Sequence, residues 1–138
     1  MTKVVKIEKN GGPEVLEIKN VDIKDPQPDQ VLIEQKAIGL NYIDTYHRAG
    51  SYPLPLPTGI GLEAAGVIKK IGSKVKDLSV GDLVAYAGVP LGAYAEKSAM
   101  LGQQIADRGR AWRLDHNADF NVWIELKFLL FKVTHGFG

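Results

Sequence analysis

The chain has 138 residues, enough for one domain with a modest hydrophobic core. Its formal net charge of +1 offers no strong field for nucleic acid or an anionic membrane, and there is neither a run of about eighteen apolar residues nor a basic leader, so we expect a cytoplasmic protein that binds neither. The absence of cysteine excludes disulfides, Cys-ligated zinc and iron–sulfur clusters.

Most of the first hundred residues predict β structure. Six segments have the apolar–polar alternation or the β-branched composition of short strands: residues 4–9, 15–23, 31–40, 63–72, 82–88 and 92–100. Between the first two, the sequence NGGP predicts a turn, because glycine permits positive φ and proline fixes φ. Strands of this length and spacing indicate a mainly β fold, a small barrel or curled sheet with short helices.

One short helix is predicted between the third and fourth strands, over residues 41–50. Ile43, Tyr46 and His47 are spaced to share one face of it, and Gly50 suits a C-terminal stop. Asn41 is a residue type favoured at a helix N-cap.

Composition changes near residue 100. All seven prolines and all five tyrosines precede residue 95, whereas the four phenylalanines and both tryptophans follow residue 110. We therefore treat residues 1–100 as one domain and residues 101–138 as an atypical tail of uncertain structure. Within the tail, residues 122–133 fit either a strand or a buried helix, and periodicity does not decide between them.

The stretch TGIGLEAAG, residues 58–66, has the glycine content of a phosphate-binding loop. A dinucleotide fingerprint requires a third glycine three positions after the second, followed by a helix, whereas Gly66 comes five positions after Gly61 and is followed by the alternating VIKKIG. No Gly-Lys-Ser/Thr sequence is present. We therefore expect no phosphate at this loop.

Read with its neighbours, from Gly39 to Tyr86, the same stretch resembles the catalytic domain of the medium-chain dehydrogenase/reductase superfamily. The zinc-dependent alcohol dehydrogenases of that superfamily carry a zinc-binding histidine in G-H-E-x-x-G and a zinc-binding cysteine in G-x-C-x-x-D. Here Leu62 and Asn41 occupy those two positions, and the segment after VAY has no four-cysteine zinc lobe. The combination, together with GGPEVL and AIGLNYIDTY, resembles the zinc-free quinone oxidoreductase branch.

The resemblance implies a GroES-like β-barrel followed by a Rossmann domain that binds NADPH, with hydride transfer to quinones or enones and no zinc or other metal. The Rossmann domain is absent from these 138 residues, so we expect a truncated chain with no independent activity. Its tail resembles nothing in the family, and we attribute it to a shifted reading frame or a rearrangement. A face left without its cofactor domain would favour self-association.

The resemblance assigns catalytic roles to Asn41, Tyr46 and Tyr52, and cofactor contacts to Asn41 and Tyr46. The alternatives are a helix N-cap for Asn41 and aromatic packing over the barrel mouth for the two tyrosines. The partner implied is a quinone-like small molecule.

Four further residues have supporting or structural roles in this hypothesis. Asp44 and Glu63, which lie behind the metal in zinc-binding relatives, are expected to hydrogen-bond the backbone. Leu62 would form an apolar wall. His47, with no second ligand at a suitable spacing, is expected at the surface.

Three functions remain open from the sequence: an NADPH-dependent quinone reductase that is inactive as this chain alone, a non-catalytic GroES-like interaction module, and a binder of apolar or quinone-like ligands without turnover.

Overall fold

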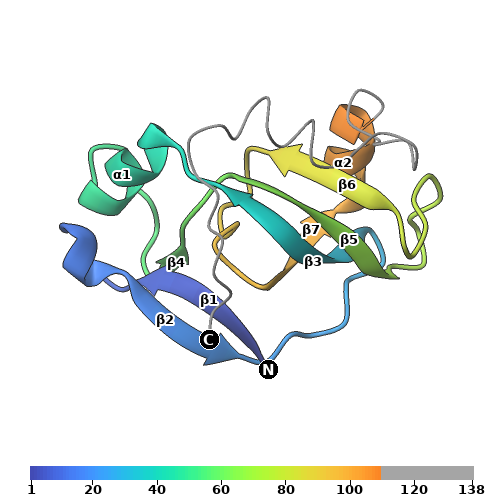
Figure 1. Ribbon diagram of the computed structural model, residues 1–138, viewed down its shortest axis with the longest axis horizontal. Coiled ribbons are helices and arrows are strands. Elements are labelled where there is room, and N and C mark those ends of the chain that lie inside the picture. The colour runs from blue at the N-terminus through green and yellow to red at the C-terminus, as the bar shows by residue number, and fades with distance from the viewer. Residues whose placement is uncertain (110–138) are drawn as a thin grey trace.

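The computed structural model describes residues 1–109, with side chains as far as residue 105. Its elements in chain order are β1 (Thr2–Ile7), the 3-10 turn η1 (Pro13–Val15), β2 (Glu17–Val21), β3 (Gln30–Gly39), α1 (Tyr42–Ala49), β4 (Thr58–Gly59), β5 (Glu63–Ile71), β6 (Leu83–Ala87), β7 (Lys97–Leu101) and α2 (Gly102–Gly109). They form a three-stranded sheet in the order β2-β1-β4 and a four-stranded sheet in the order β6-β5-β3-β7 (Figure 1). The predicted mainly β fold with short helices is confirmed.

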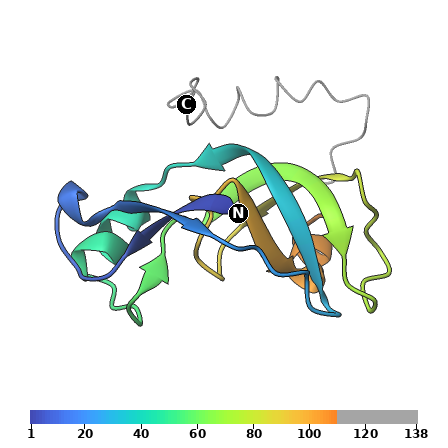
Figure 2. The same cartoon turned by 90° about the horizontal axis from the view of Figure 1, so that it is seen from below.

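The four-stranded sheet is antiparallel throughout, with β3 between β5 and β7. The β3–β5 register shifts twice, between Leu32 and Ile33 and between Gln35 and Ala37. Bulges of this kind bend strands, and both strands are visibly curved in Figure 2. Gly66 lies beside the second shift, where an added Cβ would come 2.2 Å from the carbonyl oxygen of Glu34. This glycine is therefore required for the close approach of β3 and β5.

The predicted last strand, residues 92–100, serves both sheets. Its first part pairs with β1, through the N–H of Val5 donating to the carbonyl of Tyr94 at 2.8 Å and the N–H of Glu96 donating to that of Lys3 at 3.0 Å. Its second part is β7, which pairs with β3. Glu96 bonds both neighbours, because its carbonyl accepts the N–H of Gln35 in β3 at 2.9 Å, and this change of partner joins the two sheets into one curled barrel.

The core consists of two clusters. The larger one lies on the four-stranded sheet and includes Ile33, Ile68 and Ile105, each fully buried. Ile105 belongs to α2, so the packed core extends beyond residue 100, while the proposed division of the chain at that position stays a prediction. The smaller cluster, Ile7, Val15 and Ile60, lies under the three-stranded sheet.

Two local features differ from the expectations. β4 has only two residues, too few to produce a periodic pattern, and lies inside the glycine-rich stretch. The second strand begins at Glu17 because Pro13 opens a 3-10 turn immediately before it. The alternatives for residues 122–133 lie outside the described residues. Within residues 1–109, no helix is long and apolar enough to span a membrane.

Candidate functional site

The candidate site is built on α1 and begins at its N-terminus. Asn41 occupies the N-cap in an extended conformation, as its residue type predicted. The Asp44 carboxylate accepts a hydrogen bond of 3.0 Å from the backbone N–H of Asn41, one half of the reciprocal capping pattern. The expectation that Asp44 bonds the backbone is therefore confirmed, and the pairing fixes the entry of the chain into α1.

The other end of α1 is held by the loop between β1 and β2. Gly50 ends the helix with a φ of 87°, as expected for a glycine stop. The Asn10 side-chain amide donates to the carbonyls of His47 and Arg48, at 3.3 and 3.2 Å. Gly11 and Arg48 bond each other in both directions, because the Gly11 N–H donates to the Arg48 carbonyl and Arg48 Nε donates to the Gly11 carbonyl. The NGGP turn thus also anchors the helix.

A side-chain hydrogen bond connects the start of α1 to β5. Asn41 Nδ2 donates to Glu63 Oε2 at 3.1 Å. Because a carboxylate can only accept, this bond sets the orientation of the amide, with Nδ2 toward Glu63. Gly39 leaves the required space, since a Cβ there would lie 2.9 Å from the carboxyl carbon of Glu63. Glu63 therefore bonds a side chain, not the backbone as the sequence suggested.

Behind the helix, Asp44 accepts a second hydrogen bond, from the hydroxyl of Tyr94 at 2.8 Å. Asp44 is 3% exposed. Burial, followed by the bond to Asp44, raises the pKa of the Tyr94 hydroxyl far above its ordinary value, so this hydroxyl remains a donor. The tyrosine ring passes over Gly61, whose φ is 97° and whose added Cβ would lie 2.4 Å from the ring. The glycines of the 58–66 stretch thus serve close packing.

On the outer side of α1, three tyrosines form a row, here called the tyrosine row. Tyr42 and Tyr46 meet edge to face with ring centroids 5.2 Å apart, and Tyr46 and Tyr52 do so at 5.4 Å. Their exposed fractions are 76%, 40% and 51% in chain order. Neighbouring rings are inclined by 80° and 68°, so the row presents ring faces and ring edges together with hydroxyl groups. Tyr42 was missed, although its spacing of four from Tyr46 places both on one helical face.

The prediction for His47 is wrong. We expected it at the surface, but it is 8% exposed and shares the buried side of α1 with Asp44, three residues earlier. Its Nδ1 has no hydrogen-bond partner among the described residues, and its ring lies 6.1 Å from that of Tyr52. The expected face of Ile43, Tyr46 and His47 is therefore split, since Tyr46 points outward.

The structure places the remaining predicted residues as follows. Tyr46 and Tyr52 lie together in the tyrosine row, and Asn41 immediately precedes Tyr42, its first member. Leu62 is partly buried and its carbonyl accepts the N–H of Gly88 at 2.8 Å. Within residues 1–109, no three His, Cys, Asp or Glu side chains lie together as potential metal ligands.

Comparison with known proteins identifies relatives of this chain. The family model of the alcohol dehydrogenase GroES-like domain matches residues 27–108. A quinone oxidoreductase of Pseudomonas aeruginosa is 46% identical over 106 residues, covering 76% of this chain and 33% of that protein. Quinone oxidoreductase 1 of Escherichia coli is 46% identical over 114 residues, covering 77% of this chain and 35% of that protein.

A solved structure agrees with these matches. The crystal structure of Escherichia coli quinone oxidoreductase complexed with NADPH superposes with a TM-score of 0.72 and 45% identity, covering 74% of this chain and 32% of that one. The present chain therefore spans about a third of the length of the relatives it matches. The described elements correspond to a GroES-like domain, as the resemblance implied.

Proposed function

Because the chain belongs to the alcohol dehydrogenase GroES-like domain family, within its zinc-free quinone oxidoreductase branch, we propose that α1 forms the substrate side of an NADPH-dependent quinone reductase site. The observation that carries the proposal is the tyrosine row beginning next to an Asn41 amide whose orientation is set by Glu63. An exposed aromatic face or edge can pack against a flat ring, and an amide of fixed orientation sets the direction of a hydrogen bond to that ring's substituents.

The described residues fit the nicotinamide end of NADPH. Asn41 and Tyr46 would hold the nicotinamide, which supplies a hydride when bound. With Nδ2 directed to Glu63, the amide oxygen of Asn41 is the group available to accept a hydrogen bond from the N–H₂ of a carboxamide. The glycines at 61 and 66 are occupied by contacts with Tyr94 and β3, which gives no support for a pyrophosphate site there.

The quinone would lie on the same surface, beside Tyr52. A quinone is a strong electrophile, so the main tasks of the protein are to hold it face to face with the hydride donor and to exclude water. Tyr46 and Tyr52 are exposed by about half, and their hydroxyls can donate hydrogen bonds to the carbonyl oxygen as negative charge develops there. This role requires no metal ligand at Leu62 or Asn41.

The chain on its own is proposed to be inactive. Relatives are about three times as long, and the residues described here offer contacts for one end of the cofactor only. Purified chain mixed with NADPH and 1,4-naphthoquinone should oxidise no NADPH above the rate without protein.

A second candidate function, a non-catalytic interaction module, draws support from further exposed apolar side chains. Leu40 is 57% exposed beside the tyrosine row, and Val89 is 65% exposed in the loop after β6. Exposed apolar surface favours association, including self-association. Light scattering that shows a strict monomer up to high concentration would remove the support for this candidate.

Binding of a nicotinamide probe tests the main proposal. We would titrate ¹⁵N-labelled chain with reduced nicotinamide mononucleotide and compare Asn41→Ala with Asn20→Ala, a matched change on exposed β2. Shifts should concentrate at residues 41–52, and Asn41→Ala should weaken binding about fivefold, the value of one hydrogen bond. Equal affinities of the two variants, or shifts confined to another surface, would contradict the proposal.

A further inference from the structure

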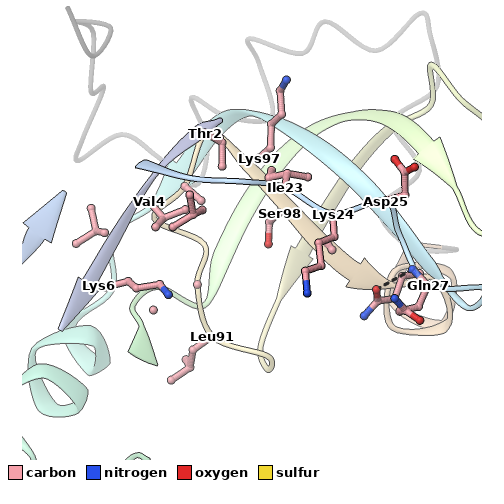
Figure 3. A pocket seen from close by; sticks show the side chains of 17 residues that line it. Thr2, Val4, Lys6, Ile23, Lys24, Asp25, Gln27, Leu91, Lys97 and Ser98 are labelled. Carbon is pink, nitrogen blue, oxygen red and sulfur yellow. Dashed lines mark hydrogen bonds between the residues drawn. The ribbon is translucent and has the colours of Figure 1, made fainter. Parts of the chain in front are cut away.

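A hollow of about 390 Å³ lies between β1 and β7, and none of the candidate-site residues lines it. It opens where the last strand leaves β1 to pair with β3, and the segment that follows β2 crosses it (Figure 3). Its volume is in the range of small-molecule sites. We call it the β1–β7 hollow.

The walls of the β1–β7 hollow are largely apolar. They are formed by Val4 of β1, Ile23 after β2, Leu91 of the loop before β7, and Ala99 of β7. Figure 3 shows Val4 and Ile23 on two sides of this space, with Leu91 at its margin. A ligand for such a surface needs an apolar body.

Two ammonium groups enter the same space. In Figure 3 the side chains of Lys6 and Lys24 extend into the hollow from β1 and from the segment after β2, whereas those of Asp25 and Lys97 point away. The two ammonium groups lie at opposite ends of the hollow in this view and are the charged groups directed into it. The hydroxyl-bearing side chain of Ser98 is directed to the same space.

The neighbouring carboxylates pair with other cations. Glu17, directly opposite Lys6 in the β1–β2 register, bonds Lys19 at 3.3 Å. Asp25, next to Lys24, pairs with Lys70. Within the described part of the chain, neither Lys6 nor Lys24 forms an ion pair with a carboxylate. Their positive charges therefore face the hollow uncompensated.

From this arrangement we propose that the β1–β7 hollow binds a small carboxylate with a short apolar body. The carboxylate would pair with one of these two ammonium groups, and the apolar body would lie against Val4 and Ile23 between them. Inorganic phosphate fits less well, because most of the wall offers it no hydrogen-bond donor and would strip its hydration. The size of the hollow limits the ligand to a free small molecule. This site is independent of the proposed reductase function.

Octanoate is a suitable probe. Octanol, which keeps the apolar chain without the charge, and inorganic phosphate, which keeps a negative charge without the apolar chain, are the controls. In ¹⁵N NMR titrations octanoate should shift the amides of β1, β7 and residues 22–25, and should bind at least about fivefold more tightly than either control. Its affinity should fall as sodium chloride rises, because half-exposed ion pairs are screened.

Lysine variants give the decisive comparison. At least one of Lys6→Met and Lys24→Met should weaken octanoate binding about three- to tenfold, whereas Lys76→Met, an exposed lysine outside the hollow, should leave octanoate binding unchanged. A native-like spectrum for each variant establishes that it folds. Equal binding of octanol, an equal loss in Lys76→Met, or shifts confined to the tyrosine row would overturn the proposal.

Discussion

The hydroxyl of Tyr94 donates a 2.8 Å hydrogen bond to the buried carboxylate of Asp44, fifty residues earlier in the chain. The same carboxylate caps α1 through the N–H of Asn41. One buried acid therefore connects the start of the helix to the segment that joins the two sheets. The position of the tyrosine row depends on this connection, since two of its three members, Tyr42 and Tyr46, lie on α1.

Removing the Tyr94 hydroxyl should destabilise the fold. Tyr94→Phe keeps the ring against Gly61 but leaves Asp44 with one donor fewer in a buried site, which costs about 1–3 kcal/mol of unfolding free energy. Tyr42→Phe, a control at an exposed hydroxyl, should change stability by less than about 0.5 kcal/mol. Urea denaturation measures both, and equal effects would show that the bond to Asp44 contributes nothing.

Alkaline pH should destabilise the protein through two tyrosines. Burial raises the pKa of Tyr86 to about 12 and that of Tyr94 further, so the folded state retains protons that the unfolded chain loses near pH 10. The unfolding free energy keeps the full contribution of these tyrosines below pH 10. Above pH 10 it falls, by at most about 1.4 kcal/mol per pH unit for each tyrosine. Tyr86→Phe and Tyr94→Phe should each flatten this fall; an unchanged slope in both would contradict the assignment.

A methyl group at Gly66 should be poorly tolerated. Gly66→Ala places Cβ 2.2 Å from the backbone carbonyl oxygen of Glu34, which can move only with β3, so we expect a loss above about 2 kcal/mol. Gly12→Ala is the matched control, because its Cβ would meet the flexible end of Glu14 and its φ of −77° suits alanine. Its loss should stay below about 1 kcal/mol. If thermal unfolding gives similar losses of stability for Gly66→Ala and Gly12→Ala, then β3 and β5 can move apart at little cost in free energy, which would contradict this prediction.

Replacing the buried His47 by an apolar side chain should cost little. His47→Leu removes an Nδ1 that has no partner among the described residues, and unfolding free energy should stay the same or rise by up to about 1 kcal/mol. His47→Ala also removes volume and should be less stable than His47→Leu. A loss above about 2 kcal/mol in His47→Leu would indicate that the ring nitrogen makes a hydrogen bond in solution.

Much of the fold could be predicted from the sequence because it depends on local patterns. Alternation located β3 and β5, and Asn41 with Gly50 marked the ends of α1 correctly. The helix face was misjudged because apolar residues were assumed to be buried, whereas Asp44 and His47 are the buried pair. That inversion depends on partners distant in sequence, such as Tyr94.

The candidate site was predictable in its residue types and less so in its connections. Asn41, Tyr46 and Tyr52 came from the family resemblance. The place of Tyr52 in the tyrosine row depends on the path of the loop after α1, which the sequence does not specify. The Asn41–Glu63 bond joins residues 22 apart on different elements. The β1–β7 hollow was missed because it arises from a strand that changes partners, and alternation is the same before and after the change.

Intermolecular NOEs between 1,4-naphthoquinone and the protein test the central claim, that the tyrosine row is the surface on which the quinone lies. With the quinone in excess over labelled chain, we predict NOEs from its ring protons to the rings of Tyr46 and Tyr52, weakened when Glu63→Met removes the oxygen that accepts the hydrogen bond of the Asn41 amide. NOEs restricted to the β1–β7 hollow or to another surface, with none to the tyrosine row, would contradict the account.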